Sequence, residues 1–216
     1  MTTVISRQQL TRCALWVAAG FGVALGIVSA LVGGMDAAFH IRDFDSGLSI
    51  GTLAYAIAGD CGGVAIAFSI ARYNKTGALA LAGALGLGVG YFVTTVMHSV
   101  YIEPRVTGEV AFASASMVRF ALIGAWTGLL LGAVQSNWKY IWLVIVAGAI
   151  GFGLASLAQT VANPALSRIS ETPNAIANAI NFGIQGAIGG LIGGAFLGAA
   201  MWQSSRSGTY KDNTRA

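Results

Sequence analysis

The amino-acid sequence predicts an all-α membrane protein with six transmembrane helices, arranged as three tandem two-helix repeats in a pseudo-threefold, glycine-zipper-packed bundle. Three observations predict this fold class: the composition, the long apolar runs and the spacing of the glycines. Of the 216 residues, 56% are apolar and only 9% are charged, and 30 are glycine. Soluble domains carry about 25% charged residues. The composition therefore excludes an ordinary soluble domain.

Six apolar runs are long enough to cross a membrane. A helix needs about 20 predominantly apolar residues to span roughly 30 Å of hydrocarbon. Only the second run is interrupted by a charge, at Asp60. A cleaved signal peptide is the alternative interpretation of the first run, but this run is longer than the roughly 7–15 residues of a signal core, so we expect a retained helix. The predicted spans are 13–34, 48–71, 77–98, 120–136, 140–160 and 175–202.

Small residues recur every fourth position, which places them on one helix face where backbones can approach closely. The same four-residue spacing appears in the second, fourth and sixth spans, at offsets of 65 and then 62 residues. The predicted packing glycines are Gly59, Gly63, Gly124, Gly128, Gly132, Gly186, Gly190 and Gly194. The first span carries its own stripe of small residues at Ala14, Ala18, Gly22, Gly26, Ala30 and Gly34.

A second motif repeats at the same offset of 65 residues. Ala82-Gly83-Ala84 in the third span recurs as Ala147-Gly148-Ala149 in the fifth, whereas Ala19-Gly20 is the best, looser counterpart in the first. We therefore predict a single transmembrane domain, 1–216, with repeats 11–75, 76–138 and 139–203. Because each unit has an even number of crossings, the units should be related by an axis along the membrane normal. Two separate small-residue stripes on the third span also favour more neighbours than six helices supply.

The connections and the charges predict an orientation. Three long loops are expected at 35–47, 99–116 and 161–174, short turns at 72–75 and 136–139, and a flexible tail at 204–216. The termini and short turns hold eight of the 12 basic residues and one acid, Asp212. Basic residues favour the cytoplasmic side, so we expect both termini in the cytoplasm and the protein in the plasma membrane. This distribution also explains the net charge of +4 without nucleic acid.

Asp60 is the main candidate for a functional residue. It lies about twelve residues into the second span, roughly 18 Å deep, where a carboxylate costs about 3 kcal/mol. We therefore expect it to face the bundle or a wet cavity, to be partnered, or to be protonated, and Arg119 and Gln185 are the candidate partners. Asn181 and His98 complete the predicted substrate- or ion-binding set. Three roles remain open for Asp60: an interhelical clamp, a transport or proton-relay group, and a contact with a partner subunit.

The remaining motifs exclude several chemistries. No His/Cys cluster has zinc spacing, and no Gly-Lys-Ser or Gly-Lys-Thr motif follows the glycines. Cys13 and Cys61 are expected to be packing residues, and His98 and His40 to have ordinary interfacial or loop roles. We expect no metal and no enzyme activity, because no pair of catalytic groups converges, and no cofactor is assigned.

Two functions from different classes follow. In the first, the protein is a small-solute, ion or proton transporter or channel that uses a mid-membrane carboxylate. In the second, it is a non-catalytic structural or assembly subunit of a larger membrane complex. The expected partners are the lipid bilayer and either other membrane subunits or further copies of the chain as a homo-oligomer.

Overall fold

The computed structural model describes residues 2–39, 44–102, 105, 107–135, 138–167 and 174–212, and these are almost entirely helical. All six long helices are long and apolar enough to cross a membrane, which fits a multi-pass membrane protein. A short π-helix, His98–Ile102, follows the third of them. The six helices are α1 (Thr2–Phe39), α2 (Phe44–Ser69), α3 (Thr76–Met97), α4 (Glu109–Val134), α5 (Trp138–Ser167) and α6 (Ala175–Asp212).

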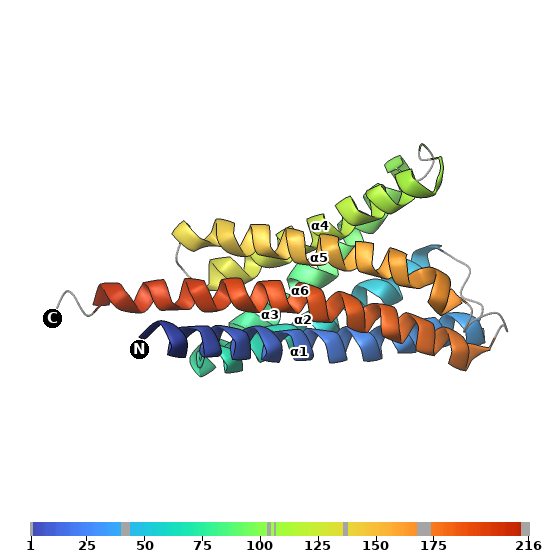
Figure 1. The fold of residues 1–216 in the computed structure, drawn as a ribbon. Coiled ribbons are helices and arrows are strands. Elements are labelled where there is room, and N and C mark those ends of the chain that lie inside the picture. The colour runs from blue at the N-terminus through green and yellow to red at the C-terminus, as the bar shows by residue number, and fades with distance from the viewer. Residues whose placement is uncertain are drawn as a thin grey trace.

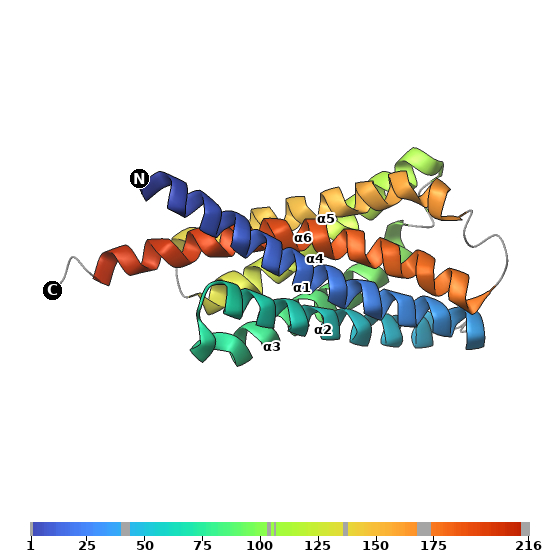
Figure 2. The ribbon, with the colours of Figure 1, turned by 60° about the horizontal axis from the view of Figure 1, so that its bottom comes forward.

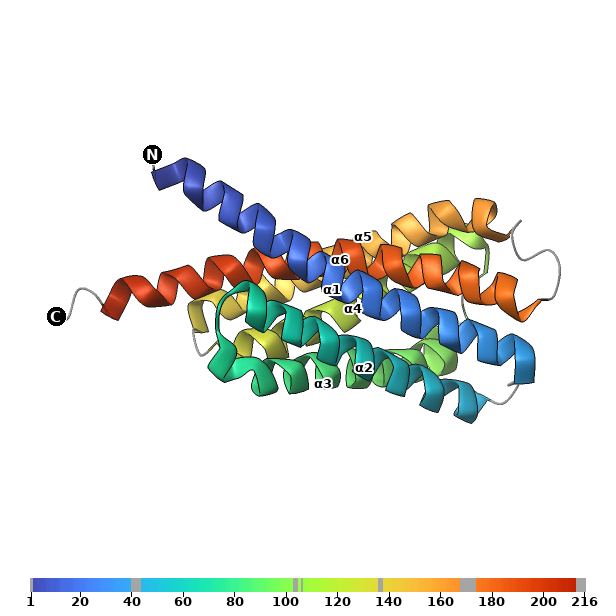
Figure 3. The ribbon, with the colours of Figure 1, turned by 90° about the horizontal axis from the view of Figure 1, so that it is seen from below.

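The helices form a closed ring. Each helix packs against the next along the chain, and α1 closes the ring against α6. The most extensive interfaces are α1 with α6, α4 with α5, and α2 with α3. Both termini lie at one end of the bundle together with the short connections, and the long connections lie at the other end (Figures 1 and 2). Seen from below, α1 crosses α6 obliquely near the middle of the bundle, and its N-terminal part lies apart from α6 (Figure 3).

Specific backbone contacts end α2 and hold the short-turn end together. The Arg72 N–H donates to the Ala67 carbonyl at 2.9 Å and the Ala71 N–H to the Phe68 carbonyl at 3.3 Å. Ala71 has a φ of 53°, so this is a Schellman motif with alanine in the position that glycine usually takes. Lys75 Nζ then donates to the Val134 carbonyl at 2.7 Å, which places a cation at the C-terminus of α4.

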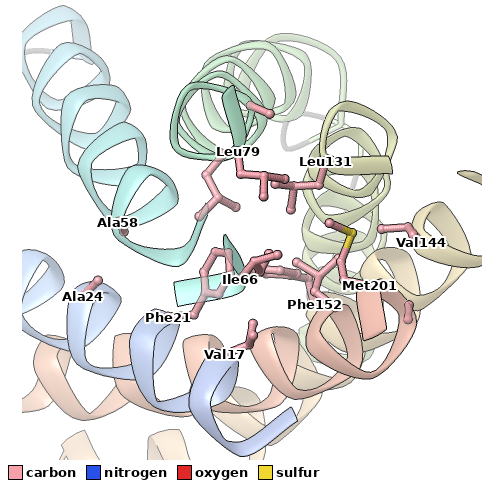
Figure 4. Close-up of a cluster of buried hydrophobic side chains, with 14 of the residues drawn as sticks. Val17, Phe21, Ala24, Ala58, Ile66, Leu79, Leu131, Val144, Phe152 and Met201 are labelled. Carbon is pink, nitrogen blue, oxygen red and sulfur yellow. The ribbon is translucent and has the colours of Figure 1, made fainter. Parts of the chain in front are cut away.

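A sealed apolar core occupies the half of the bundle nearer the short turns. Phe21 of α1 meets Phe152 of α5 edge-on, with 6.5 Å between ring centroids. Ile66, Leu131 and Met201 are also fully buried. Figure 4 shows these side chains converging from helices around the ring. Close packing therefore fills the centre of this half, and a hollow of about 440 Å³ lies at its flank beside Cys13, Ser69 and Trp202.

The predicted packing glycines lie where helices touch. A Cβ at Gly59 would collide with the Gly83 carbonyl, and a Cβ at Gly124 would collide with the Gly148 carbonyl. A Cβ at Gly132 would lie 3.3 Å from the Ile141 Cα, a looser approach. The other five would meet backbone of the adjacent helix: Gly63 at Leu79, Gly128 at Val144, Gly186 at Leu25, Gly190 at Phe21 and Gly194 at Val17.

The small residues of α1 and α3 are covered within the chain itself. A Cβ at Gly26 would lie 3.2 Å from the Ala187 Cβ, and one at Gly34 would lie 3.4 Å from the Ala179 Cβ, so α1 turns its small face toward α6. On α3, Gly86 faces Thr127 of α4 and Gly88 faces Ala56 of α2. The glycines of both stripes on the third span therefore have neighbours within the chain itself.

Several predicted helix boundaries are also wrong, and in these cases the helix is longer than predicted. Within the described residues, the expected loops at 35–47, 99–116 and 161–174 are almost entirely helical, and α6 continues to Asp212 through most of the predicted flexible tail. The segment from Glu109 to Arg119 contains neither glycine nor proline, so a helix continues through it beyond the apolar run. Pro164 lies within α5. His40 and the loop residues Arg42, Asp43, Glu103, Arg168 and Glu171 lie outside the described residues.

Candidate functional site

A hollow with a mixed polar and apolar lining lies inside the ring, in the half of the bundle nearer the long connections. It has a volume of about 240 Å³, and all six helices line it. Because the opposite half is filled by the apolar core, the two ends of the bundle differ in chemistry. Each helix contributes at least one polar or aromatic lining side chain, among them Ser29, Tyr55, Tyr91, Arg119, Gln159 and Gln185.

Arg119 brings a positive charge to this hollow. It lies within the candidate span of α4, about 8 Å outward of Gly124 at 1.5 Å per residue. One terminal nitrogen donates to Thr95 Oγ1 at 2.5 Å, and Nε is buried without a hydrogen-bond partner. No carboxylate among the described residues forms an ion pair with it. The guanidinium is therefore held by neutral groups, with donor capacity left over.

Aromatic rings surround the guanidinium. It lies 5.2 Å from the centroid of the Tyr91 ring and 5.7 Å from that of Phe120, distances at which a cation is attracted by an aromatic face. Tyr55 stacks on Tyr91, with 4.3 Å between centroids and 18° between planes. Phe182 also lines the hollow. These rings position Arg119 without neutralising its charge.

An amide network forms the opposite wall. Gln185 Nε2 donates to Asn181 Oδ1 at 2.8 Å and to Asn163 Oδ1 at 3.4 Å. Gln159 Nε2 donates to the Gln185 carbonyl at 2.7 Å, which joins α5 to α6. Asn181 is 8% exposed, so the network reaches well into the bundle. Neutral amides of this kind supply both donors and acceptors to a bound solute.

A larger hollow of about 720 Å³ adjoins the central one between α4, α5 and α6. The two share Phe120, Gln159 and Gln185 as lining residues. The start of α4 rises away from the outer end of α5 on this side of the bundle (Figure 1). The lining mixes an apolar ring, Phe112, with the polar side chains Ser116, Ser156, Thr160 and Asn163. The combined space is amphipathic and reaches the flank of the bundle.

The structure corrects the expected surroundings of Asp60. This residue is exposed on the outer face of α2, between the exposed side chains of Ile57 and Phe68, and it lines neither hollow. The expected approach of Arg119 or Gln185 to Asp60 does not occur, because both side chains have the other partners described above. Glycine positions explain this: Gly59 and Gly63 face α3, and a residue about 100° from Gly59 on the helix turns outward.

Of the five predicted binding residues, three therefore come together. Arg119 and Gln185 line the central hollow, and Asn181 is hydrogen-bonded to Gln185. His98 is buried, with its ring edge-on to Phe112 at 5.9 Å, but it lines neither hollow. The sequence interpretation missed Tyr91, Gln159 and Asn163. Asn163 falls in the stretch 161–174 that the sequence predicts as a loop.

Comparison with protein-family models, with curated proteins and with solved structures finds no match to this chain. The function is therefore argued from the geometry of the hollow.

Proposed function

We propose that this chain is a multi-pass membrane carrier for a small amphipathic anion, with Arg119 as the residue that recognises the negative charge. The observation that carries this proposal is a guanidinium at a hollow inside the bundle whose hydrogen-bond and aromatic partners are all neutral. Charged side chains within spans are costly and mark solute or ion pathways. Arginine is well suited to carboxylates and phosphates, because its planar donors form short charge-assisted bonds.

The lining indicates the rest of the solute. Tyr55, Tyr91 and Phe120 offer an apolar, aromatic surface beside the charge, and the Gln185 amide network offers neutral hydrogen-bonding groups. A small molecule with one acidic group and an apolar or planar body satisfies all three features. A carboxylate mechanism at Asp60 is not carried forward, because Asp60 lies outside the hollow.

The two ends of the bundle differ, since one contains the hollow and the other the apolar core, and this difference favours a carrier over a fixed receptor. The hollow occupies one half of the bundle, and the packed side chains around Phe21 and Phe152 fill the other. Passage of a solute requires these core side chains to part. In many carriers, structural repeats move against each other around a central site, and glycine faces without side chains permit such sliding.

We also propose three tandem two-helix units in a pseudo-threefold, glycine-zipper arrangement. The support is that the helix contacts repeat at the same spacing as the sequence. Gly59 packs on Gly83 as Gly124 packs on Gly148. One turn further along, Gly63 packs on Leu79 as Gly128 packs on Val144. The third match is Gly186 on Leu25 and Gly190 on Phe21. Leu25, rather than Gly20, then takes the place of Gly83, since Gly20 faces Ala65 of α2.

The proposed orientation follows the basic residues. Both termini and the short turns face the cytoplasm, in the plasma membrane, and the hollow opens toward the outside. Under this orientation Arg119 meets solutes from the external side before the apolar core blocks them.

The proposal is tested by ligand binding and by flux. Purified protein is screened by thermal shift against amphipathic carboxylates and phosphates and against amines of matched size, and anions that stabilise it are tested for uptake into proteoliposomes. We expect anions alone to stabilise, and Arg119→Gln to weaken their binding about 10- to 100-fold, which corresponds to a charged hydrogen bond of about 1.5–3 kcal/mol. Equal stabilisation by amines, or unchanged anion binding in Arg119→Gln, would overturn it.

The second candidate function, an assembly subunit of a larger complex, is favoured by one observation. Asp60 lies on the outer surface of a candidate span, among apolar side chains, where lipid alone satisfies a carboxyl poorly.

A further inference from the structure

The outer face of α2 combines apolar side chains with a single acid. Leu53 is 64% exposed, Ile57 48% and Phe68 59%, and Asp60 and Cys61 are exposed between them. At 3.6 residues per turn these positions lie between about 100° and 200° round the helix from Gly59, which packs on α3 together with Gly63. The chain itself therefore covers the glycine side of α2 and leaves the acid side open.

Asp60 lies near the middle of its span. It follows Gly59, which meets Gly83 near the centre of α3. Within the described part of the chain, no hydrogen-bond donor or cation contacts the Asp60 carboxyl. A charged carboxylate at this depth costs about 3 kcal/mol on insertion scales, and an uncharged carboxyl still leaves hydrogen-bonding groups unsatisfied in hydrocarbon. This face therefore requires a partner that supplies hydrogen bonds at mid-depth.

We propose that the outer face of α2 is a twofold interface between two copies of this chain, in which the two Asp60 carboxyl groups hydrogen-bond to each other. Two copies inserted the same way up are related by an axis along the membrane normal, so identical residues meet at identical depth. Each protonated carboxyl donates its O–H to the carbonyl oxygen of the other. The pair is uncharged and satisfies both groups, and Leu53, Ile57 and Phe68 pack around it.

The second copy could contact the outer face of α2 either with its own α2 face or with a different face. The rest of the surface favours the α2 face. At the depth of Asp60, the large exposed side chains of the other helices are apolar, such as Ile27 on α1 and Leu85 on α3, except for Trp126 on α4. The Trp126 indole N–H can donate a hydrogen bond to a carboxyl but cannot accept one from it. The same face of a second copy brings a group that both donates and accepts to this level.

Cysteine cross-linking in proteoliposomes of the purified chain tests the interface. A Cys13→Ala chain keeps Cys61 on the proposed interface, and Ile57→Cys in a background with Cys13→Ala and Cys61→Ser moves the thiol one turn along the same face. The matched control places the thiol on α3 instead, as Leu85→Cys in that background. With an oxidising catalyst at high lipid dilution, we expect disulfide dimers from the two α2 thiols and at least tenfold less from the α3 thiol.

Variants of Asp60 test the carboxyl pair separately from apolar contact. An amide pair also hydrogen-bonds across the interface, so Asp60→Asn should keep the dimer. Asp60→Leu should lower the association constant about fivefold to thirtyfold, the equivalent of an intramembrane hydrogen bond of about 1–2 kcal/mol. Association is measured by single-molecule photobleaching, and helix content by circular dichroism shows that each variant is folded.

Three results would overturn the proposal: equal cross-linking from α2 and α3, a purely monomeric wild-type chain in liposomes, or unchanged association in Asp60→Leu. A Cys61 adduct that forms with another protein in native membranes, and never between copies in liposomes, would likewise assign the face to a different partner. The outcome is independent of solute binding, because Asp60 lines neither hollow.

Discussion

Replacing Gly59 with alanine places a methyl group against the backbone of α3. The added Cβ collides with the carbonyl of Gly83 and with the next peptide nitrogen, that of Ala84. These are backbone atoms, which cannot rotate away as the end of a flexible side chain does. The substitution therefore forces α2 and α3 apart where they approach most closely.

The size of the effect follows from the geometry. An ordinary contact of a Cβ with a neighbouring atom is 3.4–4 Å, so the helices must separate by on the order of 1 Å, and a gap of that size loses up to half of each dispersion contact nearby. Overpacking of a close-packed core costs about 1–3 kcal/mol, and Gly59→Ala should lie at the upper end.

Gly77→Ala is the matched control. Gly77 is in the first turn of α3, and a Cβ there meets nothing within 4 Å. Alanine at that position should be neutral or stabilising by up to about 1 kcal/mol, because it restricts the unfolded chain. The two identical chemical changes should therefore differ by about 2–4 kcal/mol.

The assay is reversible unfolding of the purified protein in mixed micelles, followed by circular dichroism as the denaturing detergent fraction rises. We expect Gly59→Ala and its counterpart Gly124→Ala to unfold earlier than the wild type by similar amounts, and Gly77→Ala to unfold no earlier. A Gly59→Ala protein as stable as Gly77→Ala would refute the reasoning that these glycines allow backbone contact. A large loss of stability in Gly59→Ala with none in Gly124→Ala would refute the equivalence of the two-helix units.

Three further predictions concern single contacts. Lys75→Met removes the ammonium from the Val134 carbonyl and should lower the unfolding free energy by about 1–2 kcal/mol in the same assay. Phe152→Ala empties a site that is 1% exposed and should cost about 3–5 kcal/mol; in liposomes it should raise leak of small anions, and an unchanged leak would contradict a sealed core. Thr95→Val removes the acceptor for Arg119 and should weaken anion binding by less than Arg119→Gln does, which a titration of both variants with one anion measures.

The spans were predictable from the sequence because hydrocarbon demands uninterrupted apolar runs. Helix ends were not, because a helix does not stop where apolar residues stop. The segment from Glu109 to Arg119 is polar enough to read as loop, yet nothing in it breaks a helix, and α4 begins at Glu109. Asn163 also lies in α5 rather than in a loop, and the helix continues there through Pro164.

The depth of a residue in the membrane was easier to derive from the sequence than the direction in which its side chain points. The position of Asp60 along its helix follows from residue counting, but α2 is apolar on all sides, so hydrophobicity alone does not show which face is inward. The glycines carry that information, since Gly59 and Gly63 mark the packed face and Asp60 lies about 100° from Gly59. Arg119 and Gln185 both line the central hollow. The contact of Arg119 with Thr95 depends on how α3 and α4 rotate in the ring, whereas Asn181 lies one turn from Gln185 on the same helix.

The most direct test of the central claim is the charge selectivity of the hollow. Ser29 lines the hollow with Arg119, and Ser114 lies on the exposed side of α4. In a chain without native thiols, Ser29→Cys and Ser114→Cys are treated with a negative and a positive thiosulfonate reagent of equal size. The account predicts that the negative reagent modifies the Ser29→Cys protein at least about tenfold faster, that Arg119→Gln removes this preference, and that Ser114→Cys shows none. A preference for the positive reagent, or one that survives Arg119→Gln, would contradict it.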